Sequence, residues 1–170
     1  MIAPDRQRTP RAFVMRWGFR MLKRPTSPLH RSADGKEHGQ STLLVFNTRS
    51  EQADTKPLFA DSLRERRCLI PCQAYYEWDH REKPAPKYLF RPAEAGPVLL
   101  CGIYRHMGDR LEFSVLTREA APDIFRFHDR MPVMLPPALA RSWLDRDVPA
   151  SSLFPRALTD IAYTRCDGSA

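Results

Sequence analysis

The sequence predicts an α+β fold, with a mainly antiparallel, curved, barrel-like β-sheet and a few short helices. Three observations lead to this prediction. Short apolar and aromatic runs recur along the chain, 16 prolines are spread through it, and few stretches have the apolar spacing of a helix. Because proline interrupts helices and central strands, this distribution favours many short elements over long ones.

Seven runs rich in β-branched, aromatic or aliphatic residues are predicted as strands. They are Phe13–Trp17, Leu43–Phe46, Cys68–Ile70, Ala74–Trp78, Lys87–Phe90, Val98–Tyr104 and Leu111–Thr117. The link between the last two contains Gly108-Asp109 and has the length of a hairpin connection. We therefore expect these two strands to be antiparallel neighbours.

Helices are predicted in three places. They are Leu58–Arg67, a short helix opening at Pro122, and Pro136–Asp145 with Leu139 and Trp143 buried. Residues 20–41 are polar and basic and are predicted to form a long loop. The segment after Val148 is expected to be a loose surface segment, and residues 1–170 are expected to form a single domain.

The charge of the chain points to a polyanionic partner. It carries 27 Lys and Arg against 20 Asp and Glu, a net charge of +7. Basic side chains release counterions when they contact a phosphate backbone, although a basic protein without such a partner remains an alternative. No apolar run reaches the roughly 20 residues of a membrane helix, and the first residues lack the apolar stretch of a secretory signal. We therefore expect a cytoplasmic protein with no membrane partner.

The four cysteines do not indicate a metal site. Cys68 and Cys72 are spaced as two ligands might be, but no Cys/His pair at zinc-finger spacing accompanies them. Both fall on one face of a predicted strand, where small buried cysteines are common. We expect both in the core, and we expect no metal and no cofactor.

Three polar residues interrupt or end apolar runs. Asn47 ends Leu43–Phe46, Glu77 lies between aromatic residues, and His128 follows Phe127. A carboxylate among aromatic side chains has a raised pKa when it is buried, which suits a general acid or base. His128 is the second natural proton carrier. The alternatives are a solvent-facing Glu77, a structural His128 and a turn residue at Asn47.

Four motifs, taken together and in this order, resemble those of the SOS-response-associated peptidase (SRAP) family. They are Arg16-Trp17-Gly18-Phe19, Asn47-Thr48-Arg49-Ser50-Glu51, Arg66-Arg67-Cys68-Leu69-Ile70-Pro71 leading to Tyr75-Tyr76-Glu77-Trp78, and His128-Asp129-Arg130-Met131-Pro132. Each motif alone is weak, but the ordered set covers most of the chain. The resemblance implies a mainly β, barrel-like α+β domain with a basic groove that captures abasic sites in single-stranded DNA.

The resemblance also implies a catalytic set. Asn47, Glu77 and His128 would form the pocket and converge in one positively lined cleft. Glu77 and His128 would move protons for opening of the sugar ring and for attack on it, and Asn47 would orient the amine or the sugar. The partner would be single-stranded DNA containing abasic sites, bound by a monomer.

Five further residues are predicted to bind DNA. Arg49 and Arg130 match arginines of the motifs and would hold phosphates. Trp17 and Trp78 offer faces on which unpaired bases stack, with core packing as the alternative that we favour for Trp78. Thr117, at the end of a strand, is predicted to lie near the sugar.

The beginning of the chain departs from the family pattern. In the family, a cysteine directly after the initiator methionine attacks the opened sugar and closes a thiazolidine crosslink, whereas Met1-Ile2-Ala3-Pro4 stands here. We expect that the family's N-terminal segment and its nucleophile are absent from this chain, so that enzymatic activity stays uncertain. The α-amine of Met1 would give a reversible Schiff base at most. A non-covalent single-stranded DNA-binding module and an autoproteolytic peptidase are the alternative functions.

Overall fold

The computed structural model describes residues 1–22, 42–94 and 96–166. The strands are β1 Ile2–Pro4, β2 Pro10–Ala12, β3 Arg16–Trp17, β4 Phe19–Leu22, β5 Thr42–Val45, β6 Asn47–Arg49, β7 Arg67–Cys72, β8 Tyr75–Trp78, β9 Lys87–Pro92, β10 Val98–Met107, β11 Arg110–Glu119, β12 Arg130–Pro132 and β13 Ile161–Arg165. The helices are η1 Ser50–Gln52, α1 Pro57–Glu65, α2 Pro122–Phe125, η2 Pro137–Leu139, α3 Ala140–Leu144, α4 Ala150–Leu153 and η3 Phe154–Arg156. Many short strands with a few short helices confirm the predicted fold class.

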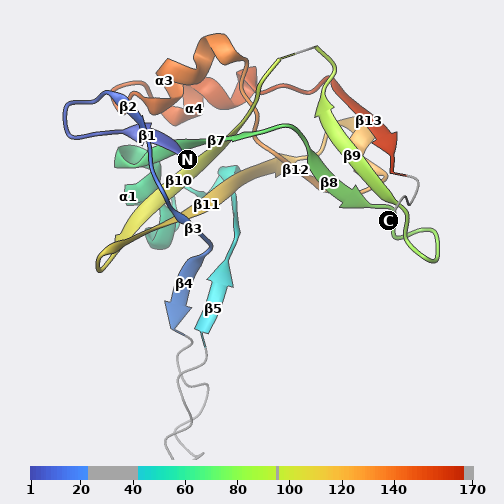
Figure 1. Cartoon of the computed structure of the whole chain (residues 1–170), viewed down its shortest axis with the longest axis horizontal. Helices are drawn as coiled ribbons and strands as arrows, with labels where there is room; N and C mark the ends of the chain where they lie inside the picture. Colours follow the sequence, from blue (N-terminus) through green and yellow to red (C-terminus); the bar gives the residue numbers. More distant parts are fainter. Residues whose placement is uncertain (23–41, 95, 167–170) are drawn as a thin grey trace, which may run out of the picture.

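The largest sheet curls around β10 and β11, the two longest strands (Figure 1). Its order is β12-β11-β10-β7-β1-β2, and every neighbouring pair along this path is antiparallel. Two short strands, β3 and β6, pair with β11 in parallel, so the sheet is mixed. The predicted β10–β11 hairpin is confirmed, and Gly108 in its turn has a φ of 62°, a conformation that glycine adopts without strain.

Two smaller sheets extend from this body. Strands β13, β9 and β8 form an antiparallel sheet, and β4 with β5 form a ribbon that projects away from the rest (Figure 1). The predicted loop 20–41 begins inside β4, while residues 23–41 lie outside the described residues. The strand predicted for Phe13–Trp17 contains only the two residues of β3.

Side chains on the two faces of the large sheet form two cores. Cys68 belongs to one core, together with Phe90 and Phe127, and its neighbour Leu69 belongs to the other, as the alternation of a strand requires. Cys68 is fully buried and Cys72 packs against the same core, which confirms both predictions. Trp143 of α3 is fully buried in the second core, and its Nε1 donates a hydrogen bond to the Cys68 carbonyl at 2.8 Å.

The C-terminal region is more ordered than the sequence suggests. We expected a loose segment after Val148, but α4 and η3 pack there and β13 pairs with β9 from Pro92 to Tyr88. Ile161, the first residue of β13, is buried in the core beside Phe90. The prediction was wrong because the exposed residues that follow Ile161 hide the pairing from local sequence patterns.

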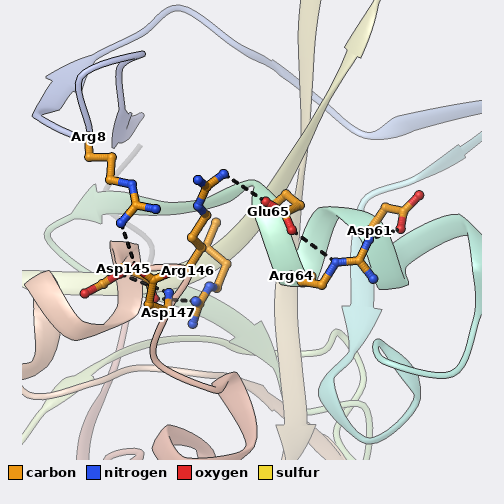
Figure 2. A network of polar contacts seen from close by, with 8 residues as sticks. Arg8, Asp61, Arg64, Glu65, Asp145, Arg146 and Asp147 are labelled. Atoms are coloured by element: carbon orange, nitrogen blue, oxygen red, sulfur yellow. Dashed lines mark hydrogen bonds and ion pairs between the residues drawn. The ribbon is translucent and has the colours of Figure 1, made fainter.

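Exposed ion pairs connect the β1–β2 turn and α1 to the segment between α3 and α4 (Figure 2). Arg8 contacts Asp147 at 2.6 Å, and Glu65 accepts from Arg64 and from Arg146. Exposed pairs of this kind contribute little stability each, about 0–1 kcal/mol. Among the described residues, no helix has the length and apolar character needed to cross a membrane.

Candidate functional site

Glu77 occupies the inward face of β8. Exposure alternates along this strand, so that Tyr75 and Glu77 are half-buried whereas Tyr76 and Trp78 are exposed. Glu77 pairs with Tyr88 of β9 across the ladder. Burial raises the pKa of the Glu77 carboxyl, and His128 and His80 act in the opposite direction. The inward face of β8 therefore carries a carboxyl that holds its proton more tightly than usual.

An aromatic cluster brings His128 to the same neighbourhood. Phe127 packs on Tyr88 with ring centroids 4.6 Å apart, and His128 is the next residue in the turn between α2 and β12. Because Tyr88 is the ladder partner of Glu77, this contact draws the turn towards β8. The electrostatic influence of His128 on Glu77 agrees with that placement.

The hydrogen bonds of His128 define its two protonation states. Its Nδ1 lies 2.8 Å from the Arg130 backbone nitrogen and 2.9 Å from Asp129 Oδ1. A bare Nδ1 accepts from the Arg130 N–H, whereas a protonated Nδ1 donates to Asp129, and one nitrogen cannot do both. In the neutral ring that accepts from Arg130, the proton is on Nε2. The side chain is 46% exposed, so it is accessible to a substrate.

Asn47 and Arg49 line a different part of the surface. Both are exposed on β6, with buried Thr48 between them. They border a hollow of about 510 Å³ together with Gln52, Lys56 and other residues of η1, α1 and the β4–β5 ribbon. Neither Glu77 nor His128 is part of that lining. The structure thus brings Glu77 within the electrostatic influence of His128, and Asn47 together with Arg49. The hollow that Asn47 lines is not the single cleft that the sequence predicted for Asn47, Glu77 and His128.

Arg130 is held within the fold. Its guanidinium donates to both carboxylate oxygens of Glu51, at 3.0 and 2.7 Å, and to the Thr117 carbonyl at 2.7 Å. Its side chain is only 18% exposed. This geometry joins η1 to β11 and β12, and it differs from the open phosphate contact that the sequence predicts. Sequence reasoning gave Glu51 no role, although its place in the Asn-Thr-Arg-Ser-Glu motif was a signal.

Thr117 is largely covered by its neighbours. It lies in β11 between Arg49 of β6 and Pro132 of β12, and it is 9% exposed. A substrate has little access to its side chain in this arrangement. The residue is instead at the centre of the strands that carry Arg49 and Arg130.

The two tryptophans are both half-exposed. Trp17 is 50% exposed, stacks on Phe113 and donates its Nε1 hydrogen bond to the Phe46 carbonyl. Trp78 is 44% exposed, so the core packing that the sequence favoured for it is wrong. It lies beside Tyr76, and Lys87 Nζ is 3.8 Å from the Tyr76 ring centroid and 5.6 Å from that of Trp78.

The α-amine of Met1 is engaged in the fold. It donates to the Phe13 carbonyl at 2.8 Å, and it is close enough to Cys68 to influence the thiol. Burial raises the pKa of Cys68 to about 12, so this thiol is not a ready nucleophile. Within the described ranges, no three His, Cys, Asp or Glu side chains are grouped to hold a metal ion.

Comparisons with known proteins agree on one family. The model of the family described as SOS response associated peptidase (SRAP) matches residues 2–165. Abasic site processing protein YedK of Escherichia coli is 28% identical over 72% of this chain and 54% of its own length. Abasic site processing protein YobE of Bacillus subtilis is 30% identical over 69% of this chain and 58% of its own length.

Solved structures share the fold. A phage-related protein from Bordetella bronchiseptica superimposes with a TM-score of 0.67 at 24% identity, covering 94% of this chain and 73% of the other. A protein from Bacteroides thetaiotaomicron gives a TM-score of 0.64 at 19% identity, covering 71% of this chain and 58% of the other. At these identities the likeness concerns the fold alone. The chain spans about half of the length of YedK, the E. coli relative that it matches.

Proposed function

Because the chain belongs to the SOS response associated peptidase (SRAP) family, we propose that it acts on abasic sites in single-stranded DNA. The relatives named above support this substrate, since they are described as abasic site processing proteins. The net charge of +7 supports a nucleic-acid partner. Asn47, Glu77 and His128 remain the proposed catalytic residues, and Arg49, Trp17 and Trp78 the proposed contacts to the strand.

The observation that carries the proposal is a half-buried Glu77 carboxyl within the electrostatic influence of His128. The sugar of an abasic site is a closed hemiacetal that must open to expose an aldehyde. Opening removes a proton from the C1 hydroxyl and adds one to the ring oxygen, so it needs a base and an acid. Burial raises the pKa of Glu77, so its carboxyl binds and releases a proton at a higher pH than usual, and His128 supplies the second group.

We assign the acid role to His128 and the base role to Glu77. In the protonated ring, Nδ1 donates to Asp129 and Nε2 carries the proton that is donated to the ring oxygen, which leaves a neutral imidazole. Glu77 then takes the proton of the C1 hydroxyl as the C1–O bond to the ring breaks. Asn47 would orient the opened sugar or the attacking amine. Arg130 would act on the site by positioning η1 and the His128 turn.

The aldehyde is a target for a primary amine. Attack by an amine followed by loss of water gives a Schiff base, and a neighbouring thiol is needed to close it into a thiazolidine. The Cys68 thiol is buried and its pKa is raised to about 12, so we propose that the reaction of this chain stops at a reversible Schiff base.

The experiment is a trapping assay on the full chain. Single-stranded DNA with one abasic site is incubated with the protein and resolved on denaturing gels with and without borohydride. We expect a crosslinked band only with borohydride, and an undamaged strand of the same sequence serves as the control. Glu77→Gln should slow trapping at least tenfold with little loss of DNA affinity. Absence of trapping under both conditions contradicts the proposed chemistry.

A non-covalent single-stranded DNA-binding module is the second candidate. Tyr76, Trp78 and Lys87 form an exposed aromatic and cationic surface on the outer face of β8, which suits stacked bases and a phosphate backbone. This function predicts salt-sensitive binding that does not distinguish an abasic strand from an intact one. The same gels and a salt titration therefore separate the two candidates.

A further inference from the structure

Tyr75 carries a buried hydroxyl that makes no hydrogen bond with any other described residue. The oxygen has almost no exposed surface and no hydrogen bond to any described residue. The ring is stacked on the fully buried Phe90, with centroids 5.2 Å apart and planes 20° apart, so it is held in place. A phenylalanine would stack equally well and would not bury an unsatisfied hydroxyl. A role in packing therefore explains the ring of Tyr75 but not its hydroxyl.

The nearest acidic group on the same strand face is Glu77. Tyr75 and Glu77 are separated by one outward-facing residue, so their side chains rise from the same face about 6.7 Å apart along the strand. Side chains in strands lean along the strand direction, which lets such a pair meet. The negative charge of Glu77 adds to the burial that raises the pKa of Tyr75, so the two groups influence each other already.

The groups around Glu77 show which interaction the Tyr75 hydroxyl would add, namely a hydrogen bond to the Glu77 carboxylate. Two histidines act electrostatically on the Glu77 carboxyl: His128, with Asp129 beside it, in the turn before β12, and His80, two residues after β8 ends. Tyr88 lies directly opposite on β9. Both histidines favour the ionised carboxylate, but none of these described neighbours donates a hydrogen bond to it.

We infer that Tyr75 is a positioning residue: after a shift of the Glu77 side chain along the strand face, the Tyr75 hydroxyl donates a hydrogen bond to the Glu77 carboxylate and holds it for proton exchange with a substrate. The hydroxyl gains the acceptor that it lacks, and the carboxylate gains a donor on its buried side. Such a bond favours the charged form of Glu77 and opposes the effect of burial. This inference rests on the proposed function of Glu77, and it adds a residue to that site.

The test is the Tyr75→Phe variant of the full chain. The Glu77 carboxyl is titrated by carbon-detected NMR on glutamate-labelled protein, with Glu77→Gln used to assign the resonance. Loss of a donor to the charged form should raise the Glu77 pKa by about 0.5–1 unit. The acid limb of the trapping rate should move to higher pH by the same amount. Tyr76→Phe, on the exposed face of the same strand, is the matched control and should change neither quantity.

The outcomes separate this inference from the proposed function, because the titration uses no DNA. A Glu77 pKa that is the same in Tyr75→Phe and in the parent chain overturns the inference, whether or not the parent traps abasic DNA. A raised Glu77 pKa supports it, even if the parent forms no crosslink and the proposed chemistry fails. A variant with an unchanged Glu77 pKa and a higher melting temperature would show that the hydroxyl is only buried.

Discussion

The pairing of Glu51 with Arg130 decides whether Arg130 is part of the fold or part of the DNA interface. The carboxylate receives two charge-assisted hydrogen bonds, at 3.0 and 2.7 Å. Buried bonds of this kind are worth about 1.5–3 kcal/mol each, and exposed ion pairs about 0–1 kcal/mol. Glu51 is half-exposed and Arg130 is 18% exposed, so solvent screens one partner more than the other. We expect a coupling free energy between the two of about 1–2 kcal/mol.

The measurement is a double-mutant cycle of Glu51→Gln and Arg130→Met, read as free energies of unfolding in urea. Arg130→Met should be the more destabilising change, since it also removes the bond to the Thr117 carbonyl. Burial acts to raise the pKa of Glu51, but its bonds to Arg130 and to backbone N–H groups lower the pKa overall. The stabilisation is therefore present above the pKa of an unfolded glutamate and is lost as pH falls through the lower, folded value.

A DNA-binding titration gives the second arm of this test. If Arg130 is held by Glu51, Arg130→Met should leave the salt dependence of single-stranded DNA binding unchanged. Arg49→Met is the matched control, because Arg49 is exposed and makes no ion pair with a described residue. It should reduce the salt slope by about 0.7. A coupling free energy below about 0.3 kcal/mol, together with a reduced slope for Arg130→Met, would refute the reasoning.

Three further outcomes are expected. Burial makes the folded chain bind the Glu77 proton more tightly than the unfolded chain does, so the free energy of unfolding should decline as pH rises above the ordinary glutamate range. In Glu77→Gln this decline, measured by urea unfolding, should be weaker. A pH dependence that is the same in the variant and the parent would argue against a buried carboxyl. Gly102→Ala places a Cβ 2.5 Å from Ile70 Cδ1 and 3.1 Å from the Ser114 carbonyl oxygen. The free energy of unfolding, measured by calorimetry, should fall by about 1–3 kcal/mol, and an unchanged melting temperature would contradict the packing. Trp78→Ala should weaken binding to intact single-stranded DNA by about 1–3 kcal/mol in fluorescence anisotropy, whereas equal affinity would remove this residue from the interface.

The strands and helices could be predicted from the sequence better than the pairings between distant segments. The β10–β11 hairpin and α2 could be predicted because a turn glycine and an N-terminal proline are local signals. The pairing of β13 with β9 joins residues about 70 positions apart, and its exposed residues carry no alternating pattern. The contact of Glu51 with Arg130 spans 79 positions. Contacts of this length depend on the folded topology, which no local pattern encodes.

The orientation of β8 shows where the site prediction reached its limit. Alternation alone places Tyr75 and Glu77 on one face and Tyr76 and Trp78 on the other, but it does not say which face is inside. Hydrophobicity favours burial of the face that carries Trp78. The structure buries the face that carries Glu77 instead, because its two ladder partners on β9 belong to the aromatic cluster.

The observed orientation of β8 buries the Glu77 carboxyl, which destabilises the fold, so stability alone does not explain why β8 has this orientation. Turning β8 over would bury Trp78 and leave Glu77 in water, which removes the penalty that raises the carboxyl pKa. The inward position of Glu77 does, however, give its carboxyl a raised pKa within the electrostatic influence of His128. Positions where a local rule is broken without a structural gain are the ones at which function is expected. By this reasoning Glu77 is the strongest catalytic assignment in the chain, ahead of Asn47, whose exposed position on β6 breaks no such rule.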